Sequence, residues 1–370
     1  MKNTIKNQAA AEAVLRLTQD LIRFKTMHGT PDEIRRCARF IANDLNTCGI
    51  AHQTFEHNGY PSILVLPRAN YAPVLLMSHI DVVDAPDALF DPVEKDGCLF
   101  GRGAIDDKYA AALSLVLLKE QVNRLKKTGR GIDSLPFGIL ITGDEEVGGH
   151  DGAKTVLADV KVDFCIALDG GTLNKVVSRE KGLLTLRLIA RGKAAHGARP
   201  WLGDNAIENL IADYGRIKAE FDISAPGHWH RTINFSRMQA GQSFNQVPDR
   251  AEAIFDIRLT EADNPEALLR LLQEKITGEL VVEQKEPMFL GGESPYLDLL
   301  VEMYGDIIVG NEHGASDARF LSERGIRGIV WGPEGDSSAH TLDEHVRIDS
   351  LFSLYDRLDA FMKKAAGLTR

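Results

Sequence analysis

The sequence has few cysteines and lacks the spacings that would give them a structural role. Four are present among 370 residues, Cys37, Cys48, Cys98 and Cys165, and none forms a CxxC pair. Such a count is no disulfide framework for a chain of this length, and it indicates buried thiols in a reducing compartment. We therefore expect a cytoplasmic protein.

Long hydrophobic runs are missing as well. The N-terminal stretch MKNTIKNQAAAEAVLRL contains two lysines but neither an apolar segment nor a small-residue cleavage site, so we expect no signal peptide. Apolar runs such as 62–66 and 73–77 fall far short of the roughly 20 residues that a membrane span requires. We expect a chain that does not cross a membrane.

The sequence also lacks an excess of positive charge. Lys and Arg number 43 against 53 Asp and Glu, which gives a net charge of −10. A general nucleic-acid binder needs a basic face, and an anionic membrane surface attracts basic segments, so we expect neither as a partner. The 44% of hydrophobic residues suffice for a full core, and the length predicts two or three domains.

Helical and strand patterns alternate through the first half of the chain and again at its end. Helices are predicted over residues 8–24, 107–125, 296–303 and 350–366, and another begins at a capping box, Thr30–Glu33, and ends near Gly49. Residues 62–66 are a short apolar stretch, a buried strand is predicted at 74–77, and further strands are predicted at 137–142, 164–168 and 328–331. Strands separated by helices at this spacing predict βαβ units. The expected fold class is α/β, with a mostly parallel sheet and helices on both faces.

The pattern changes between about residues 182 and 291. Alternating strands at 183–189, 232–237 and 251–259 and a strand beginning at 279 combine with helices at 205–221 and 265–276. The order β-α-β-β-α-β is that of a ferredoxin-like, two-layer α+β unit. We predict that residues 183–291 form a domain inserted into a catalytic domain made of residues 1–182 and 292–370.

Polar side chains follow several of the predicted strands at the point where each strand ends. They are His79 and Asp81 after the strand at 74–77, Glu145 and Glu146 after 137–142, Asp169 after 164–168, Asp106 before the helix at 107–125, and His340 after 328–331. Ligands bind beyond the carboxyl ends of the strands in open α/β sheets. We therefore expect these side chains to gather at one edge of the sheet.

Two histidines and several carboxylates suit a divalent metal of borderline hardness, such as zinc. The charge of two such ions is balanced by a bridging hydroxide and three carboxylates, those of Asp106, Glu146 and Asp169. Glu145 then remains beside the site as a general base. Asp81 lies two residues from His79, on the same face of the strand, and suits a carboxylate that holds the imidazole tautomer.

Seven stretches, in order along almost the whole chain, resemble those of a known enzyme family. They are SHIDVV (78–83), GRGAIDDK (101–108), GDEEVGG (143–149), ALDGG (167–171), GKAAHGARPWLGDNAI (192–207), HGASDARF (313–320) and GPEGDSSAHTLDEHV (332–346). The family is that of the dinuclear-zinc amidohydrolases, which includes succinyl-diaminopimelate desuccinylase, acetylornithine deacetylase, glutamate carboxypeptidase, aminoacylase, and the di- and tripeptidases. A catalytic α/β domain interrupted by a small lid is also the architecture of that family.

The resemblance implies a role for each residue of the predicted cluster. One metal ion would be held by His79 and Asp169, the other by Glu146 and His340, and both by Asp106. The Asp106–Asp107 peptide bond is typically cis in such proteins. Glu145 would take a proton from metal-activated water and deliver it to the leaving amine. The implied cofactors are two divalent ions per chain, Zn²⁺ or else Co²⁺ or Mn²⁺.

Four further residues match positions that contact substrate in the family. His196 would reach the active site of the partner subunit, in a homodimer formed through the inserted domain, and help to stabilise the oxyanion. Asn245 and Arg258 would bind substrate, with the arginine gripping a free carboxylate as a bidentate fork. Gly314 would belong to the loop that lines the substrate pocket.

Single members of these sets also have ordinary structural explanations. Asp106 could simply cap its helix. His196 could be a structural residue of its loop, and Arg258 could pair with Asp256 or Asp249. The set of predicted ligands as a whole, in order and at strand ends, nevertheless favours metal binding.

Two features indicate different substrates within the same chemistry. Asp169, in the run Leu-Asp-Gly-Gly, resembles the di- and tripeptidase branch, because the desuccinylases and deacetylases usually have glutamate there. The chain length and two-domain size resemble the desuccinylases. We expect an exopeptidase that hydrolyses a short peptide with a free carboxylate, and the alternative is an N-acyl amino-acid deacylase. A catalytically silent binding homologue is disfavoured because Glu145 and the ligand set are intact.

Overall fold

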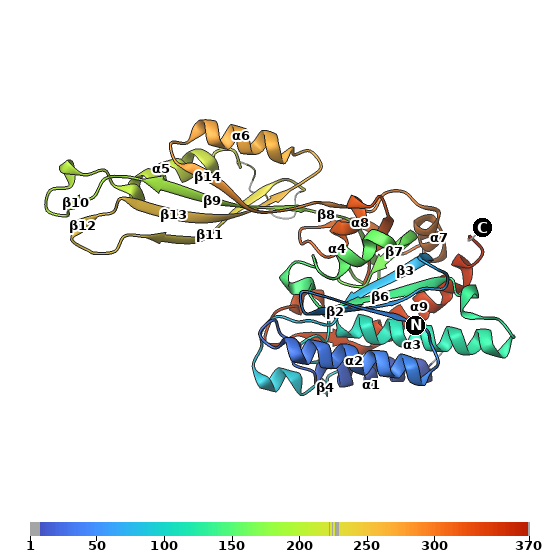
Figure 1. Ribbon diagram of the computed structural model, residues 1–370. Helices are drawn as coiled ribbons and strands as arrows, with labels where there is room; N and C mark the ends of the chain where they lie inside the picture. Colours follow the sequence, from blue (N-terminus) through green and yellow to red (C-terminus); the bar gives the residue numbers. More distant parts are fainter. Residues whose placement is uncertain (1–7, 222, 224, 226–228, 369–370) are drawn as a thin grey trace. The chain divides into compact units, whose positions relative to one another are not determined.

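The computed structural model describes residues 8–221, 223, 225 and 229–368, and it divides into two compact units (Figure 1). The larger unit combines the chain up to Arg179 with Leu290–Glu312 and with the chain from Ser316 onward. The smaller unit comprises Glu180–Phe289 and the short segment His313–Ala315. The smaller unit is therefore an insertion in the larger one. Its assignment as a lid and dimerisation domain stays a prediction.

The larger unit contains most of the regular structure. Its helices are α1 (Gln8–Ile22), α2 (Pro31–Thr47), α3 (Lys108–Lys127), α4 (Ala153–Val156), α7 (Pro295–Met303), α8 (Arg319–Glu323) and α9 (Ile348–Ala365). Its strands are β1 (Gln53–His57), β2 (Tyr60–Val65), β3 (Tyr71–His79), β4 (Val93–Lys95), β5 (Cys98–Phe100), β6 (Phe137–Thr142), β7 (Lys161–Ala167), β16 (Ile308–Glu312), β17 (Arg327–Val330) and β18 (His345–Arg347), while β8 (Lys175–Glu180) and β15 (Phe289–Leu290) lie at the two transitions to the smaller unit.

A nine-stranded mixed sheet organises this unit. Its order is β1-β2-β6-β3-β7-β17-β8-β15, and β16 pairs with β8. The central strands β6, β3, β7 and β17 are parallel, whereas β1, β2 and β8 join them in antiparallel pairs. Every residue of β6 is buried, as expected for a parallel strand covered on both faces. The carboxyl ends of the four central strands therefore open on one edge of the sheet.

Helices lie on both sides of the sheet, which confirms the predicted α/β class. The helices α1, α3 and α9 pack against one another, and α3 contacts β3 and β6, while α4 and α8 lie on the other side (Figure 1). Most of α3 is buried because Ala, Leu and Val occupy nearly every position from Tyr109 to Leu118. Among the described residues, no helix is both long enough and apolar enough to cross a membrane.

The structure departs from the sequence predictions at two places in this unit. The outer part of the sheet is antiparallel and includes short strands that the sequence analysis did not predict, such as β1 and β8. The capping box predicted at Thr30 is wrong, because the Thr30 side chain makes no hydrogen bond to the first turn of α2. Its Oγ1 donates instead to the carbonyl of Met27 (3.0 Å), which closes the preceding turn.

The main sheet and the two helices of the smaller unit follow the predicted β-α-β-β-α-β order, and the short strands β10 (Ala195–His196) and β12 (Gln246–Val247), which were not predicted, form a separate pair. This unit also contains β9 (Gly182–Arg191), α5 (Ala206–Lys218), β11 (Thr232–Ala240), β13 (Arg250–Leu259), α6 (Pro265–Lys275) and β14 (Glu279–Glu286). Its sheet has the antiparallel order β11-β13-β9-β14, which is the ferredoxin-like arrangement. Leu184, Leu186 and Leu188 alternate along β9 and are buried, and α5 and α6 begin at asparagine caps, Asn205 and Asn264.

Candidate metal centre

The predicted ligands come from the carboxyl ends of the central strands of the larger unit. His79 is the last residue of β3, and Asp169 follows two residues after β7. Glu145 and Glu146 form a short 3₁₀ turn three residues after β6, and His340 lies in the loop after β17. The parallel centre of the sheet thus brings together residues that are up to 261 positions apart in the chain.

The side chains form two groups that share Asp106. The groups are His79, Asp106 and Asp169, and Asp106, Glu146 and His340, and within each the possible ligand atoms lie within 4.8 Å of one another. Asp106 Oδ1 lies 3.0 Å from Nε2 of His79, while Asp106 Oδ2 lies 2.9 Å from Nε2 of His340. The two oxygens of one carboxylate therefore face two different histidines.

The carboxylates of this cluster favour positive charge beside them. Burial lowers the pKa of His79, but the nearby carboxylates of Asp106 and Asp81 raise it, and the net pKa lies well above the ordinary value. Hydrogen bonds to Asp106 and Glu146 raise the pKa of His340 to about 10. The same carboxylates would favour a bound cation, because several negative groups converge at one place.

The backbone around the cluster is unusual in two places. The Asp106–Asp107 peptide bond is cis, which confirms what the resemblance implied. His340 has a φ of 63°, in the left-handed region that residues other than glycine rarely adopt. Left-handed conformations of this kind persist where the surrounding structure determines them, and they gather at functional sites.

Comparison with known proteins agrees with this geometry. Residues 75–364 match the sequence pattern of peptidase family M20/M25/M40. The chain belongs to this family. It is 28% identical over 373 residues to the succinyl-diaminopimelate desuccinylase of Bordetella parapertussis, covering 93% of this chain and 96% of that one.

Solved structures of other proteins share the fold. A tripeptidase from Staphylococcus aureus superposes with a TM-score of 0.76 at 20% identity, covering 96% of this chain and 99% of that one. An M20 family metallo-carboxypeptidase from Sulfolobus solfataricus superposes with a TM-score of 0.74 at 18% identity, covering 95% and 99%. As a member of the M20/M25/M40 family, the chain is a hydrolase that acts on amide bonds.

Asp81 holds the turn that carries Glu145 and Glu146. Its carboxylate accepts hydrogen bonds from the backbone N–H groups of Glu145 (3.2 Å) and Glu146 (2.9 Å). His79 Nδ1 lies closer to the backbone carbonyl of Asp81 (3.0 Å) than to its carboxylate (3.4 Å). Because a carbonyl only accepts hydrogen bonds, Nδ1 carries the hydrogen and Nε2 faces the cluster.

The side chain of Glu145 is only 13% exposed. Burial raises its pKa well above the ordinary value, and the neighbouring carboxylate of Asp317 adds to this increase. A carboxyl group with a raised pKa is suited to both accepting and returning a proton near neutral pH. Glu145 belongs to neither of the two ligand groups, so its carboxylate remains available for proton transfer.

The sequence analysis missed three carboxylates that surround the cluster. Asp107 Oδ2 accepts a hydrogen bond from the backbone N–H of His79 (3.1 Å). Glu344 is fully buried and pairs with Arg102, and Asp317 lies next to Glu145. All of them stand within the family-like stretches, but only their burial distinguishes them from solvated acids, and burial is not visible in the sequence.

The residues predicted to bind substrate belong to the smaller unit, whereas the possible metal ligands belong to the larger one. His196 and Asn245 are neighbours there, because β10 pairs with β12 and the Gly197 N–H donates to the carbonyl of Asn245 (2.7 Å). Arg258, on β13, forms a bidentate pair with Asp256 (2.8 and 3.0 Å). Gly314 belongs to the segment that clusters with this unit. Their roles toward a substrate stay predictions.

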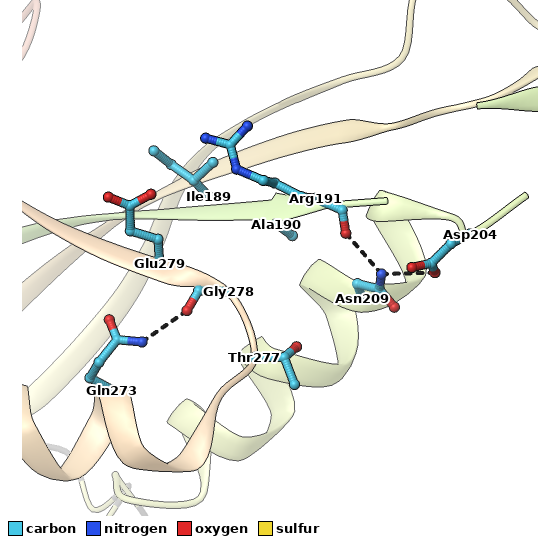
Figure 2. A pocket seen from close by; sticks show the side chains of 9 residues that line it. All are labelled: Ile189, Ala190, Arg191, Asp204, Asn209, Gln273, Thr277, Gly278 and Glu279. Atoms are coloured by element: carbon cyan, nitrogen blue, oxygen red, sulfur yellow. Dashed lines mark hydrogen bonds between the residues drawn. The ribbon is translucent and has the colours of Figure 1, made fainter. Parts of the chain in front are cut away.

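A hollow of about 560 Å³ in the smaller unit offers no comparable chemistry (Figure 2). Asn209 Nδ2 donates to the carbonyl of Arg191 (3.0 Å) and to Asp204 Oδ1 (2.9 Å), and Gln273 Nε2 donates to the carbonyl of Gly278 (2.9 Å). These polar groups bind one another and fasten α5 and α6 to the ends of the strands. Among the described residues, neither group of possible metal ligands lies here.

Proposed function

We propose that the protein hydrolyses the amide bond of a short peptide or an N-acyl amino acid that carries a free carboxylate. The observation that carries this proposal is the pair of possible ligand groups joined through Asp106, with the largely enclosed Glu145 side chain beside them. A chain of net charge −10 would repel a long polyanion such as a nucleic acid. A small substrate with one carboxylate needs attraction only from charged groups within the site.

The residues of the cluster fit two divalent ions. Imidazole nitrogen and carboxylate oxygen are the donors of catalytic zinc sites, and Co²⁺ or Mn²⁺ would accept the same donors. We propose that His79 and Asp169 hold one ion, that Glu146 and His340 hold the other, and that Asp106 contacts both. When bound, the ions would polarise the scissile carbonyl and lower the pKa of the attacking water.

Glu145 moves the proton in the proposed reaction. Its carboxylate accepts a proton from the attacking water and later donates that proton to the nitrogen of the leaving amine. Asp81 keeps Glu145 and Glu146 in place through the two backbone hydrogen bonds of their turn. The Glu145 carboxylate thus both accepts the proton and returns it without leaving its position.

His196, Asn245 and Arg258 would act on the substrate. We propose that Arg258 binds the free carboxylate, that Asn245 assists and that Gly314 lines the pocket. Asp256 accepts hydrogen bonds from Nε and Nη2, along one edge of the Arg258 guanidinium, which holds its plane fixed. His196 would stabilise the oxyanion in the active site of the partner subunit.

Homodimerisation through the smaller unit is part of the proposal. This unit exposes several large apolar side chains, namely Trp201, Leu202, Ile211, Met238 and Phe244. Its edge strand β11 is largely exposed along its length. Apolar side chains and an unpaired strand edge in one unit are typical of a surface that another chain covers. We also propose a cytoplasmic location, which the four free thiols support.

The exopeptidase and the deacylase remain two candidates with different support. Asp169, where the deacylases usually have glutamate, favours the exopeptidase. The 28% identity to a succinyl-diaminopimelate desuccinylase over 93% of the chain favours the deacylase. We place the exopeptidase first, because Asp169 belongs to the proposed ligand set itself.

A substrate screen tests the proposal. Purified protein is incubated with Zn²⁺, Mn²⁺ or Co²⁺ and with dipeptides, tripeptides, and N-acetyl and N-succinyl amino acids, and the release of free amine is measured. Each substrate is paired with its C-terminally amidated form, which we expect to be poor if Arg258 grips the carboxylate. Absence of hydrolysis from protein that contains metal would refute the proposed activity.

A further inference from the structure

A buried arginine lies beside the proposed proton-transfer residue. Arg319, the first residue of α8, is only 5% exposed. Its Nη1 lies 3.7 Å from Glu145 Oε1, and its Nη2 donates a hydrogen bond to the carbonyl of Gly148 (2.8 Å). Gly148 ends the 3₁₀ turn that contains Glu145. One guanidinium therefore contacts this turn through both its backbone and its side chain.

A second carboxylate, which is buried, lies against the same guanidinium. Asp317 is 5% exposed, and its Oδ1 lies 3.6 Å from Arg319 Nη2. Among the described residues, neither carboxylate oxygen of Asp317 has a hydrogen-bond partner. Asp317 also belongs to neither of the two possible metal-ligand groups. Its position next to Arg319 is therefore not explained by metal binding or by a hydrogen-bond network.

The backbone at Gly149 leaves room for the Asp317 carboxylate. A Cβ atom on Gly149 would lie 1.9 Å from Asp317 Oδ1, and Gly149 has a φ of 63°. Only glycine fits at this position, both because of the space and because of the conformation. Gly149 follows directly after Gly148, so Asp317 and Arg319 both contact the segment that carries Glu145.

The distances favour a positioning role over a purely structural one. A buried ion pair adds little net stability, because the loss of hydration offsets the attraction. At 3.7 Å the contact between Arg319 and Glu145 is an ion pair without a hydrogen bond. The guanidinium thus attracts the Glu145 carboxylate while leaving its lone pairs available to a water molecule.

We propose that Arg319, held in turn by Asp317, is a positioning residue for Glu145. This inference rests on the proposed function, since it assumes that Glu145 relays the proton. Arg319 keeps the carboxylate in the orientation from which it accepts and returns that proton, and Asp317 keeps the guanidinium from turning toward the ligand carboxylates. Neither residue touches the substrate or a metal ion in this scheme.

Substitution of Arg319 tests the inference. We expect R319Q to lower kcat by about 100-fold, the loss that a displacement of about 1 Å can cause, with KM changed by less than about 3-fold. R319K should recover part of kcat, because it restores the charge without the planar fork. D317N should lower kcat in the same direction. The matched control is R324Q, at the exposed end of the same helix, which should behave as the unaltered protein.

Two further measurements separate positioning from damage to the fold or to the metal site. The metal content and the absorption spectrum of the Co²⁺-loaded R319Q protein should match those of the unaltered protein. In an E145Q background, R319Q should cause no further loss of the residual turnover. If R319Q does not fold, R319K and D317N provide the same comparison.

The outcomes distinguish this inference from the proposed function. Full kcat in R319Q and D317N, a loss confined to KM, an altered Co²⁺ spectrum, or an equal loss in the E145Q background would each overturn the positioning role. Undiminished turnover in E145Q itself would overturn the proposed function instead. The assays use the best substrate of the dipeptide and N-acyl amino-acid screen.

Discussion

Glu344 holds the backbone of Asp106. Its Oε1 accepts a hydrogen bond from the N–H of Asp106 (3.3 Å), and also from those of Gly103 (2.8 Å) and Ile105 (3.2 Å). Its other oxygen pairs with the buried guanidinium of Arg102. One carboxylate from the loop after His340 thus fixes the loop that presents the carboxylate shared by both ligand groups. Two segments more than 200 residues apart are locked together at the site.

We expect E344Q to weaken both the fold and metal binding. Glutamine keeps an acceptor but leaves the charge of Arg102 buried without a counter-charge, which typically costs about 3–5 kcal/mol. Metal affinity should fall by about 10- to 100-fold, as for other residues that orient a ligand. Urea unfolding and titration against a chromogenic chelator measure the two effects. The control is D343N, an exposed neighbour, and equal metal affinity in E344Q would contradict the orienting role.

We expect E145Q to keep its metal and lose turnover. The substitution removes the carboxylate that accepts the proton, while the ligand groups stay complete, so kcat should fall by about 100- to 10,000-fold. Metal analysis of the purified variant and a steady-state assay on one substrate provide the two readouts. A variant that keeps full activity would show that another group relays the proton.

Removal of metal should destabilise the larger unit. Without cations, the carboxylates of Asp106, Glu146 and Asp169 repel one another. An ion that binds only the folded state adds about 2.7 kcal/mol to the free energy of unfolding when its free concentration is 100 times its Kd. Tm should therefore fall after chelation and recover when Zn²⁺ is restored. The H340A variant serves as the comparison, because its response should be smaller. An identical Tm with and without chelator would contradict the assignment of the ligands.

Mixed dimers test whether His196 acts in the partner's site. E145Q and H196A should each be inactive as pure dimers, but a mixed dimer contains one active site with both residues intact. Subunit exchange between them should therefore restore up to half of the activity per mixed dimer. The exchange itself is followed with differently tagged chains. No recovery despite proven exchange would place His196 outside the partner's reaction.

Local patterns in the sequence predicted the elements of the fold well where a strand or helix is long and strongly apolar. The strand at 137–142 and the split βαβ order of the smaller unit are examples. Two strands in the outer part of the sheet escaped prediction for different reasons. β8 pairs with the distant strand β17, whereas β1 forms a hairpin with the neighbouring β2 but has no hydrophobic run of its own. The wrong cap at Thr30 has a similar cause: a neighbouring turn binds the hydroxyl that would otherwise cap the helix.

By itself the sequence determined which residues form the two groups of possible metal ligands, because these residue types stand at the ends of strands and such ends meet at one edge of a parallel sheet. Tertiary structure alone decided which carboxylates support the set. Asp317, Glu344 and Asp107 look like ordinary surface acids in the chain, and Arg319 looks like an ordinary helix residue. Burial turns them into strongly interacting groups, since charges act over short distances far more strongly where water is excluded. Burial depends on the packing of segments that are distant in the sequence.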